Sequence, residues 1–150
     1  MVDSRDKGAR AETLVKETLR NYTKLKWERI PGSGALNEKH QLKGDLYVPG
    51  EKNLYCVEVK HYKDCHIDHT LITGKNPQLL EWWQQTIRQA KQVGKHPLLL
   101  FKHDRSKIFA AFISAPSDEY PYIIINRDGY EFVIALLEDY LKYEVPQFIT

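Results

Sequence analysis

The chain has 150 residues, of which 42% are hydrophobic and 28% charged, and its net charge is +2 at neutral pH. This length fits one domain, residues 1–150, and the composition is typical of a globular protein rather than a disordered or fibrous chain. No apolar run approaches the roughly 20 residues of a membrane-spanning helix, and the polar first ten residues have no signal-peptide core. We therefore expect a cytoplasmic protein without a membrane partner.

The first third of the chain predicts a helix followed by three strands. Apolar residues spaced three and four apart predict an amphipathic helix over 8–25. A short strand is expected at 27–30, before a loop rich in glycine. Runs of strand-forming residues bounded by turn residues predict further strands at 43–48 and 55–60.

The remaining two thirds continue the alternation of helices and strands. A second helix is expected at 78–93, between a proline and a glycine that suit its two ends. Strands are expected at 97–102, 107–113 and 122–126, before a last helix at 130–143. This order predicts a central mixed β-sheet flanked by helices, in the α/β or α+β class.

The predicted strands at 43–48 and 55–60 carry the most information about function. A hairpin that closes symmetrically about the turn at 50–53 sets Asp45 opposite Glu58, as the closer, non-hydrogen-bonded type of pair. Like charges about 5 Å apart destabilise a sheet, and a divalent cation would resolve the conflict because it takes carboxylate ligands. Lys60 points to the same face as Glu58. These three side chains predict metal-assisted phosphodiester chemistry.

An interpretation of the same residues without catalysis stays open. A bulge in the hairpin would shift the register by one residue and separate the two acids. The acids would then form part of a solvent-facing surface, with Lys60 as a compensating charge.

Two further segments carry groups suited to this chemistry. Glu12 lies beside the apolar stripe of the first helix and could reach over the sheet toward the two acids, or could pair with Lys16 one turn later. Arg29 and Ser33 lie in a segment whose glycines would let the backbone approach a phosphate closely, although a plain turn explains it equally well.

The second helix and the segment after it are basic. Gln85, Arg88 and Lys91 occupy polar positions beside the apolar face of the helix, and the two cations are candidates for phosphate contacts. From 88 to 107 there are six basic residues against one acid, and from 116 to 150 two against seven. This asymmetry is compatible with a nucleic-acid-binding side, and equally with a solvated mixed surface.

A cluster of possible zinc ligands, Cys65-His66-Ile67-Asp68-His69, raises a different metal site. Structural zinc sites need two well-spaced pairs of ligands, which only distant residues such as Cys56 and His40 could complete, so zinc is the weaker alternative. Cys56 lies within a predicted strand and is expected to be a small buried residue. Serine or cysteine catalysis is disfavoured because no nucleophile motif is present.

Taken in order along the chain, one set of residues resembles the motifs of the PD-(D/E)XK nuclease superfamily: Glu12, Ser33, Gly44-Asp45, Glu58-Val59-Lys60 and Gln85. The resemblance is greatest to the Holliday junction resolvase branch of the archaeal and phage kind. It covers residues 7 to 102 approximately, has Gly44 where the superfamily name has proline, and includes no motif in the last third of the chain.

The resemblance implies a restriction-endonuclease-like core and an endonuclease that hydrolyses phosphodiester bonds at four-way DNA junctions. It implies that Mg²⁺, or Mn²⁺ in its place, is held by Asp45, Glu58, the Val59 carbonyl and Glu12. Lys60 would orient the attacking water or stabilise charge at phosphorus, Ser33 would lie by the scissile phosphate, and Gln85 would support the site.

Relatives of this branch act as homodimers, so we expect a homodimer with one active site for each of two opposite strands of the junction. Two alternatives remain open at this stage. One is another PD-(D/E)XK nuclease of the restriction or repair type. The other is a non-catalytic nucleic-acid-binding module that uses the basic region at 88–107.

Overall fold

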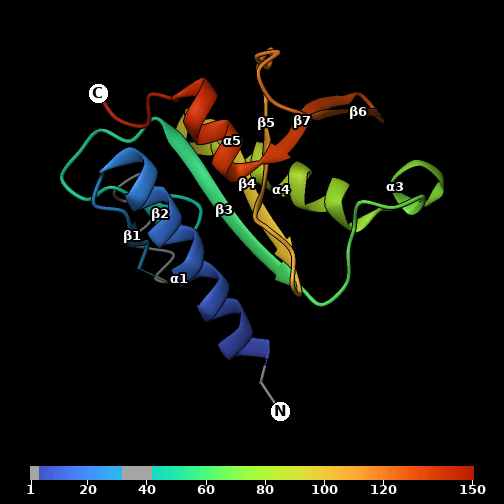
Figure 1. Cartoon of the computed structure of the whole chain (residues 1–150), viewed down its shortest axis with the longest axis horizontal. Helices are drawn as coiled ribbons and strands as arrows, with labels where there is room; N and C mark the ends of the chain where they lie inside the picture. Colours follow the sequence, from blue (N-terminus) through green and yellow to red (C-terminus); the bar gives the residue numbers. More distant parts are fainter. Residues whose placement is uncertain (1–3, 32–41) are drawn as a thin grey trace.

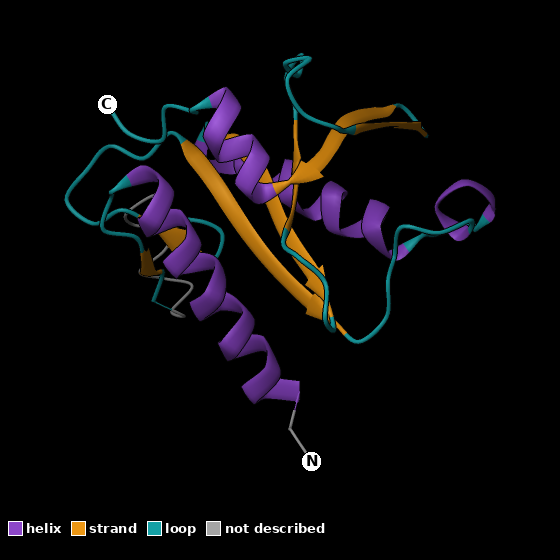
Figure 2. Ribbon diagram, in the orientation of Figure 1, coloured by secondary structure: helices purple, strands orange, loops and turns teal. Residues whose placement is uncertain are grey.

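The computed structural model describes residues 4–31 and 42–150, which form one β-sheet with helices on both of its faces (Figures 1 and 2). The strands are β1 (Glu28–Arg29), β2 (Leu46–Tyr47), β3 (Tyr55–Tyr62), β4 (His96–His103), β5 (Phe109–Phe112), β6 (Ile123–Arg127) and β7 (Tyr130–Leu136). The helices are α1 (Ser4–Thr23), α3 (Thr70–Thr73), α4 (Gln78–Val93), α5 (Leu137–Asp139) and the π-helical turn η1 (Tyr140–Glu144). None of these helices combines the length and the apolar character needed to cross a membrane.

The seven described strands lie in the order β1-β2-β3-β4-β5-β7-β6. β3 and β4 run parallel and are joined through α4, while the other described neighbours run antiparallel. Figure 1 shows β3 and β4 side by side, with α1 across one side of β3. The predicted mixed sheet flanked by helices is confirmed.

Side chains from the strands alternate between two hydrophobic cores, one on each face of the sheet. The core against α1 and η1 includes Val15, Leu19, Val57, Leu98, Leu100, Ala110, Val133 and Tyr140. The core against α4 includes Leu79, Trp83, Leu99, Phe101, Ala111, Phe132 and Ile134. Neighbouring residues of one strand therefore enter different cores, as the two-residue period of a strand requires. Glu58 lies beside Leu99 in the parallel ladder, so it faces the side of α4.

The helix predicted at 130–143 was wrong over its first half, which is the strand β7, and right over its second half, where α5 and η1 are helical. β7 pairs with both β5 and β6, and helical structure begins only with α5. Phe132 and Ile134 pack in the α4 core, whereas Val133 and Ala135 pack in the α1 core. A strand buried on both faces is a continuous apolar run, and such a run also contains the spacings of a helical stripe.

The turn between β6 and β7 contains the signal that identifies the strand. Asp128 and Gly129 have φ values of 54° and 84°, and Arg127 pairs with Tyr130 on either side of them. Two consecutive positive φ angles are what a type I′ hairpin turn requires, and Asp-Gly is a preferred pair for it. The sequence therefore held a hairpin signal that outweighs the helical spacing.

The other predicted elements agree with the structure to within a few residues. The helix at 78–93 has the predicted ends, and its C-cap, Gly94, is in the left-handed region with φ of 65°. β2 is shorter than the predicted strand at 43–48, and the short helix α3 falls in a segment for which no helix was predicted.

Candidate active site

β2 and β3 pair in the register that the hairpin argument predicted. Leu46 lies opposite Val57 in the antiparallel ladder, as the predicted register requires, but Asp45 lies just outside β2 and is not the regular ladder partner of Glu58 that was predicted. The pairing is irregular at this point, because the Asp45 N–H donates to the Val57 carbonyl at 2.7 Å. The irregularity does not separate the acids, since their side chains are hydrogen-bonded to each other.

Gly44 makes this close approach of the two strands possible. Its φ is +97°, which L side chains rarely adopt and proline cannot, and a Cβ built on it would lie 2.6 Å from the Val57 carbonyl oxygen. The chain therefore needs glycine where the superfamily name has proline, for a reason of backbone geometry.

The turn end of the hairpin is held by a side chain rather than by the regular ladder that symmetric closure predicted. Asn53 accepts a hydrogen bond from the Val48 N–H and donates one to the Val48 carbonyl, at 2.7 and 2.9 Å. Leu54 donates its N–H to the Phe148 carbonyl near the C-terminus instead of lying in the ladder with Pro49. Among the described residues, the β2–β3 ladder is thus limited to the Leu46–Val57 pair, next to the acids.

Asp45 is tied to both neighbouring strands. Its carbonyl accepts a hydrogen bond from the Ile30 N–H at 2.9 Å, and its carboxylate oxygen Oδ2 accepts one from the Val59 N–H at 2.7 Å. A carboxylate held by a backbone donor has a defined orientation. Asp45 therefore directs its carboxylate across β3, next to the residue whose carbonyl was predicted to bind metal.

Glu58 is a buried carboxyl group, with only 5% of its surface exposed. Burial and, after it, the neighbouring Asp45 carboxylate raise its pKa to about 8. Lys60 and a hydrogen bond from Gln89 act in the opposite direction and favour the charged form. At neutral pH Glu58 thus tends to hold a proton, which a cation could replace.

Gln89 is a site residue that the sequence analysis missed. It lies on α4, is hydrogen-bonded to Glu58, and its Oε1 atom is buried with no hydrogen-bond partner among the described residues. Gln85, the predicted residue, lies one turn earlier on the same helix and is half-buried. The available signal in the sequence was that Gln89 lies four residues after Gln85, and so on the same side of the helix.

Glu12 reaches the neighbourhood of the acids from α1. Burial and then the nearby Asp45 raise its pKa, while Arg29 lowers it. Its Oε1 lies 3.2 Å from Nε of Arg29, and Lys16, the partner expected one turn later, also lowers its pKa. Among the described residues, no group of three or more His, Cys, Asp or Glu is placed to hold a metal ion. A direct bond from Glu12 to the metal therefore stays a prediction.

The other candidate residues of the sequence analysis differ in what the structure describes of them. Ser33 lies outside the described residues, and Arg88 and Lys91 are on α4, where their role as phosphate contacts stays a prediction. Cys56 is fully buried, as predicted, and burial raises its pKa to about 12. The Cys65 sulfur accepts a hydrogen bond from the Ile67 N–H within its own loop.

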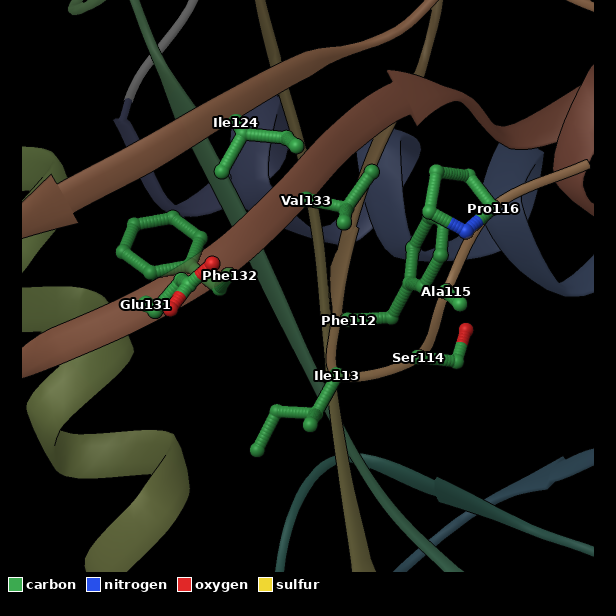
Figure 3. A pocket seen from close by; sticks show the side chains of 9 residues that line it. All are labelled: Phe112, Ile113, Ser114, Ala115, Pro116, Ile124, Glu131, Phe132 and Val133. Carbon is green, nitrogen blue, oxygen red and sulfur yellow. The ribbon is translucent and has the colours of Figure 1, made fainter. Parts of the chain in front are cut away.

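A groove of about 570 Å³ lies away from these residues, among the strands at the other end of the sheet (Figure 3). It is lined by residues of β5, β6 and β7, such as Phe112, Ile124 and Val133, together with the segment after β5. Its lining is mainly apolar, and it contains none of the predicted site residues. The candidate site is thus defined by its carboxylates and lysine rather than by this groove.

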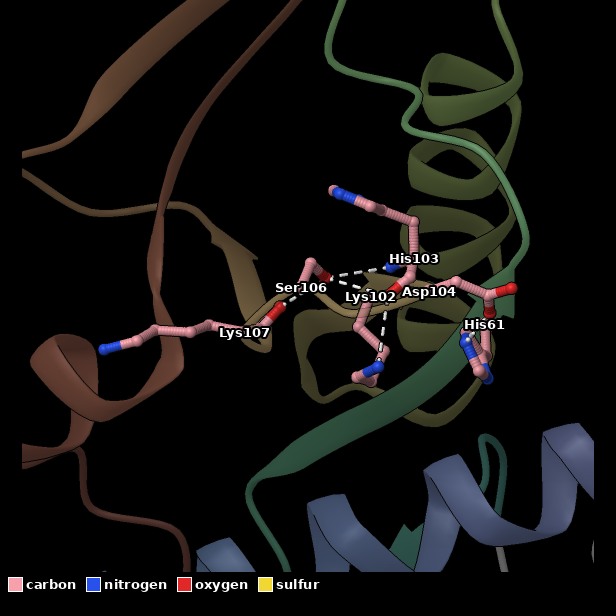
Figure 4. A network of polar contacts seen from close by, with 6 residues as sticks. All are labelled: His61, Lys102, His103, Asp104, Ser106 and Lys107. Atoms are coloured by element: carbon pink, nitrogen blue, oxygen red, sulfur yellow. Dashed lines mark hydrogen bonds and ion pairs between the residues drawn. The ribbon is translucent and has the colours of Figure 1, made fainter.

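The ends of β3 and β4 beyond Lys60 are fixed by polar contacts (Figure 4). His61 Nε2 lies 3.1 Å from Asp104 Oδ1, and the Ser106 hydroxyl both accepts from the His103 N–H and lies within hydrogen-bond distance of its carbonyl. The His61–Asp104 contact joins β3 to the turn after β4, just past the candidate site, and the Ser106 contacts lie within that turn.

Comparisons with known proteins agree with this arrangement. A family model described as "Phage putative PDDEXK endonuclease" matches residues 3–147. Protein D14 of Escherichia phage T5 is 41% identical over 150 residues, an alignment that covers 95% of this chain and 94% of the relative. No solved structure matches the chain.

Proposed function

Because this chain belongs to the phage PDDEXK endonuclease family, we propose that it is a metal-dependent DNA endonuclease selective for branched DNA, and specifically a Holliday junction resolvase. The observation that carries the proposal is the contact between the Asp45 and Glu58 carboxyl groups, with Lys60 close to them. The junction preference is supported by the order of the motifs from Glu12 to Gln85 along the chain.

The residues present fit a divalent metal. A buried carboxyl group with a raised pKa, in contact with a second carboxylate, offers hard oxygen ligands that a divalent cation would hold in the charged form. Asp45, Glu58 and the Val59 carbonyl would hold Mg²⁺, or Mn²⁺ in its place, with Glu12 beside them. When bound, such a metal polarises a phosphoryl oxygen and lowers the pKa of a coordinated water.

The protein's own side chains would orient the substrate and balance its charge. Lys60 supplies a positive charge next to Glu58, where it would orient the attacking water or stabilise the negative charge that develops at phosphorus. Gln89 favours the ionised form of Glu58 by donating a hydrogen bond to it. Arg29 and Ser33, with Arg88 and Lys91 on α4, would contact DNA phosphates.

A cleavage assay with matched variants tests the assigned site. In Mg²⁺, Asp45→Asn, Glu58→Gln and Lys60→Ala should each lower the cleavage rate by at least roughly a hundredfold while DNA binding persists, because each removes a ligand or a charge used in hydrolysis. Glu51→Gln, an exposed carboxylate in the turn of the same hairpin, should cleave as the wild type does. Full activity of the Asp45→Asn protein would show that these residues are not the active site.

A panel of substrates tests the junction preference. Four-way junctions should be cleaved faster than flaps, linear duplexes and single strands, and equal rates on all would favour a restriction- or repair-type nuclease. A binding module would show salt-sensitive affinity without metal-dependent nicking.

The homodimer is part of the same proposal, because two symmetric active sites suit a symmetric junction. Sedimentation equilibrium should give twice the mass of the chain. A monomer that still makes paired cuts would contradict this part.

A further inference from the structure

Tyr62 lies in line with the candidate active site but belongs to none of its predicted motifs. Residues 58, 60 and 62 alternate along β3, so Glu58, Lys60 and Tyr62 project from the same face of the sheet. Tyr62 still pairs with His103 of β4, which fixes its backbone. Its Cα lies about 6.6 Å from that of Lys60, roughly two steps along one strand of a DNA duplex.

The Tyr62 ring is held by other aromatic rings. Its centroid lies 4.8 Å from that of Trp82, with 35° between the ring planes, and 5.7 Å from that of His66, at 83°. His66 in turn lies 5.1 Å from Trp82, which is buried on α4. The three rings contact one another, so the orientation of Tyr62 is set before any ligand arrives.

Part of Tyr62 is nevertheless open to solvent. Tyr62 is 44% exposed, whereas Trp82 beneath it is 4% exposed. A tyrosine that served only to cover Trp82 would gain nothing from this exposure, because apolar surface left in water adds no stability. An immobilised ring with a large exposed area is instead well suited to bind a flat partner, since little conformational entropy is lost.

Nucleobases are the flat partners that a nuclease substrate offers. An aromatic side chain stacks on a base only when a face of that base is free, as in single strands, at open branch points and in splayed nucleotides. In a continuous duplex, both faces of each internal base are covered by its neighbours.

We propose that Tyr62, supported by Trp82 and His66, stacks on an unpaired base one or two nucleotides from the phosphate at Asp45, Glu58 and Lys60. The inference rests on the proposed nuclease function and adds a substrate class to it: DNA with an unpaired or unstacked nucleotide beside the cleavage position. Tyr62 is thus a substrate-binding residue that discriminates against continuous duplex.

Binding without cleavage tests the stacking directly. Two DNA probes are used in EDTA: a four-way junction with 2-aminopurine at the branch point, and a linear duplex with 2-aminopurine paired at its centre. Wild-type protein should quench the fluorescence of the first probe and leave the second unchanged. Tyr62→Ala should abolish this quenching and weaken binding to the junction about tenfold, with little effect on the duplex.

Matched variants separate stacking from folding. Tyr62→Trp should keep the quenching, whereas Tyr62→Leu, which still covers Trp82 but has no aromatic face, should lose it. Tyr22→Ala removes a tyrosine of similar exposure, 46%, on α1 and should behave as the wild type does. Thermal unfolding midpoints of all variants show whether the fold is kept.

The failure of this inference is distinct from failure of the proposed function. Quenching by Tyr62→Leu equal to that of the wild type, or no quenching by the wild type, would overturn the stacking, whether or not the protein cleaves DNA in Mg²⁺. Absence of metal-dependent cleavage would overturn the nuclease, whatever the fluorescence shows.

Discussion

Glu58 shows how much of the proposed chemistry depends on one residue's surroundings. The carboxyl group is buried and lies against a second acid, while Lys60 and a hydrogen bond from Gln89 favour its charged form. Without a cation, its ionisation is therefore unfavourable in the folded protein. Glu58 therefore lowers the stability of the metal-free folded protein. A function that requires both acids explains why it is present.

Replacing this acid should stabilise the metal-free protein at high pH. The pKa of Glu58 is about 8 in the folded protein, against 4.5 for a glutamate free in water, so the folded state binds more protons between these values and stability falls as pH rises from 4.5 to 8. Glu58→Gln removes this loss. In EDTA its free energy of unfolding should exceed that of the wild type by up to roughly 5 kcal/mol above pH 8, and match it near pH 4.

Urea unfolding at pH 4, 6 and 9 measures this difference. Glu51→Gln, which alters an exposed acid of the same hairpin, should show no comparable trend. A Glu58→Gln protein less stable than the wild type at pH 9 would contradict the assignment of an unfavourable buried charge.

At the scale of the hairpin, the approach of β2 to β3 depends on Gly44. A methyl group there would meet the Val57 carbonyl oxygen at 2.6 Å, and its φ of +97° would be strained for any L side chain. The strands would have to separate next to Asp45, which would alter its contact with Glu58.

Gly44→Ala should therefore lower both stability and activity. We expect a loss of about 1 to 3 kcal/mol in the free energy of unfolding, and a cleavage rate reduced more than this loss explains at temperatures where the variant stays folded. Gly50→Ala is the matched control: its φ is also positive, at +78°, but no atom lies within 4 Å of an added Cβ. Equal cleavage by the two variants would show that strand approach does not set the site.

The hairpin and β7 show what could be predicted at this scale from the sequence. The register at Leu46 and Val57 followed from the two-residue period of strands and is confirmed, whereas the regular ladder predicted from there to the turn was wrong. β7 was missed because a strand buried on both faces lacks alternation. Gln89 was missed because a residue's distance to a neighbouring strand depends on tertiary packing, which the helical pattern alone does not contain.

At the scale of the whole molecule, α1, the sheet and α4 each place a residue in or near the candidate site. Glu12 comes from α1, Asp45 and Glu58 from the sheet, and Gln89 from α4. A cation bound between the acids would thus favour the assembled fold over the unfolded chain, in which these groups are far apart.

Mg²⁺ should accordingly raise the thermal unfolding midpoint of the wild type. At a concentration about 100 times its dissociation constant, linkage gives about 2.7 kcal/mol, or roughly 5 to 10 °C for a chain of this length. The rise should disappear in Asp45→Asn, as measured by differential scanning calorimetry with Mg²⁺ and with EDTA. An equal rise in both proteins would place the ion elsewhere.

β3 presents Val57 to one hydrophobic core and Glu58 and Lys60 to the opposite side. One extra residue inserted between positions 55 and 58 would reverse the faces of all later side chains of β3. Glu58 and Lys60 would then point into the hydrophobic core against α1. Insertions and deletions among homologues should thus fall in the turn at 49–53. The segment from 55 to 60 should keep its number of residues, although its side chains can vary.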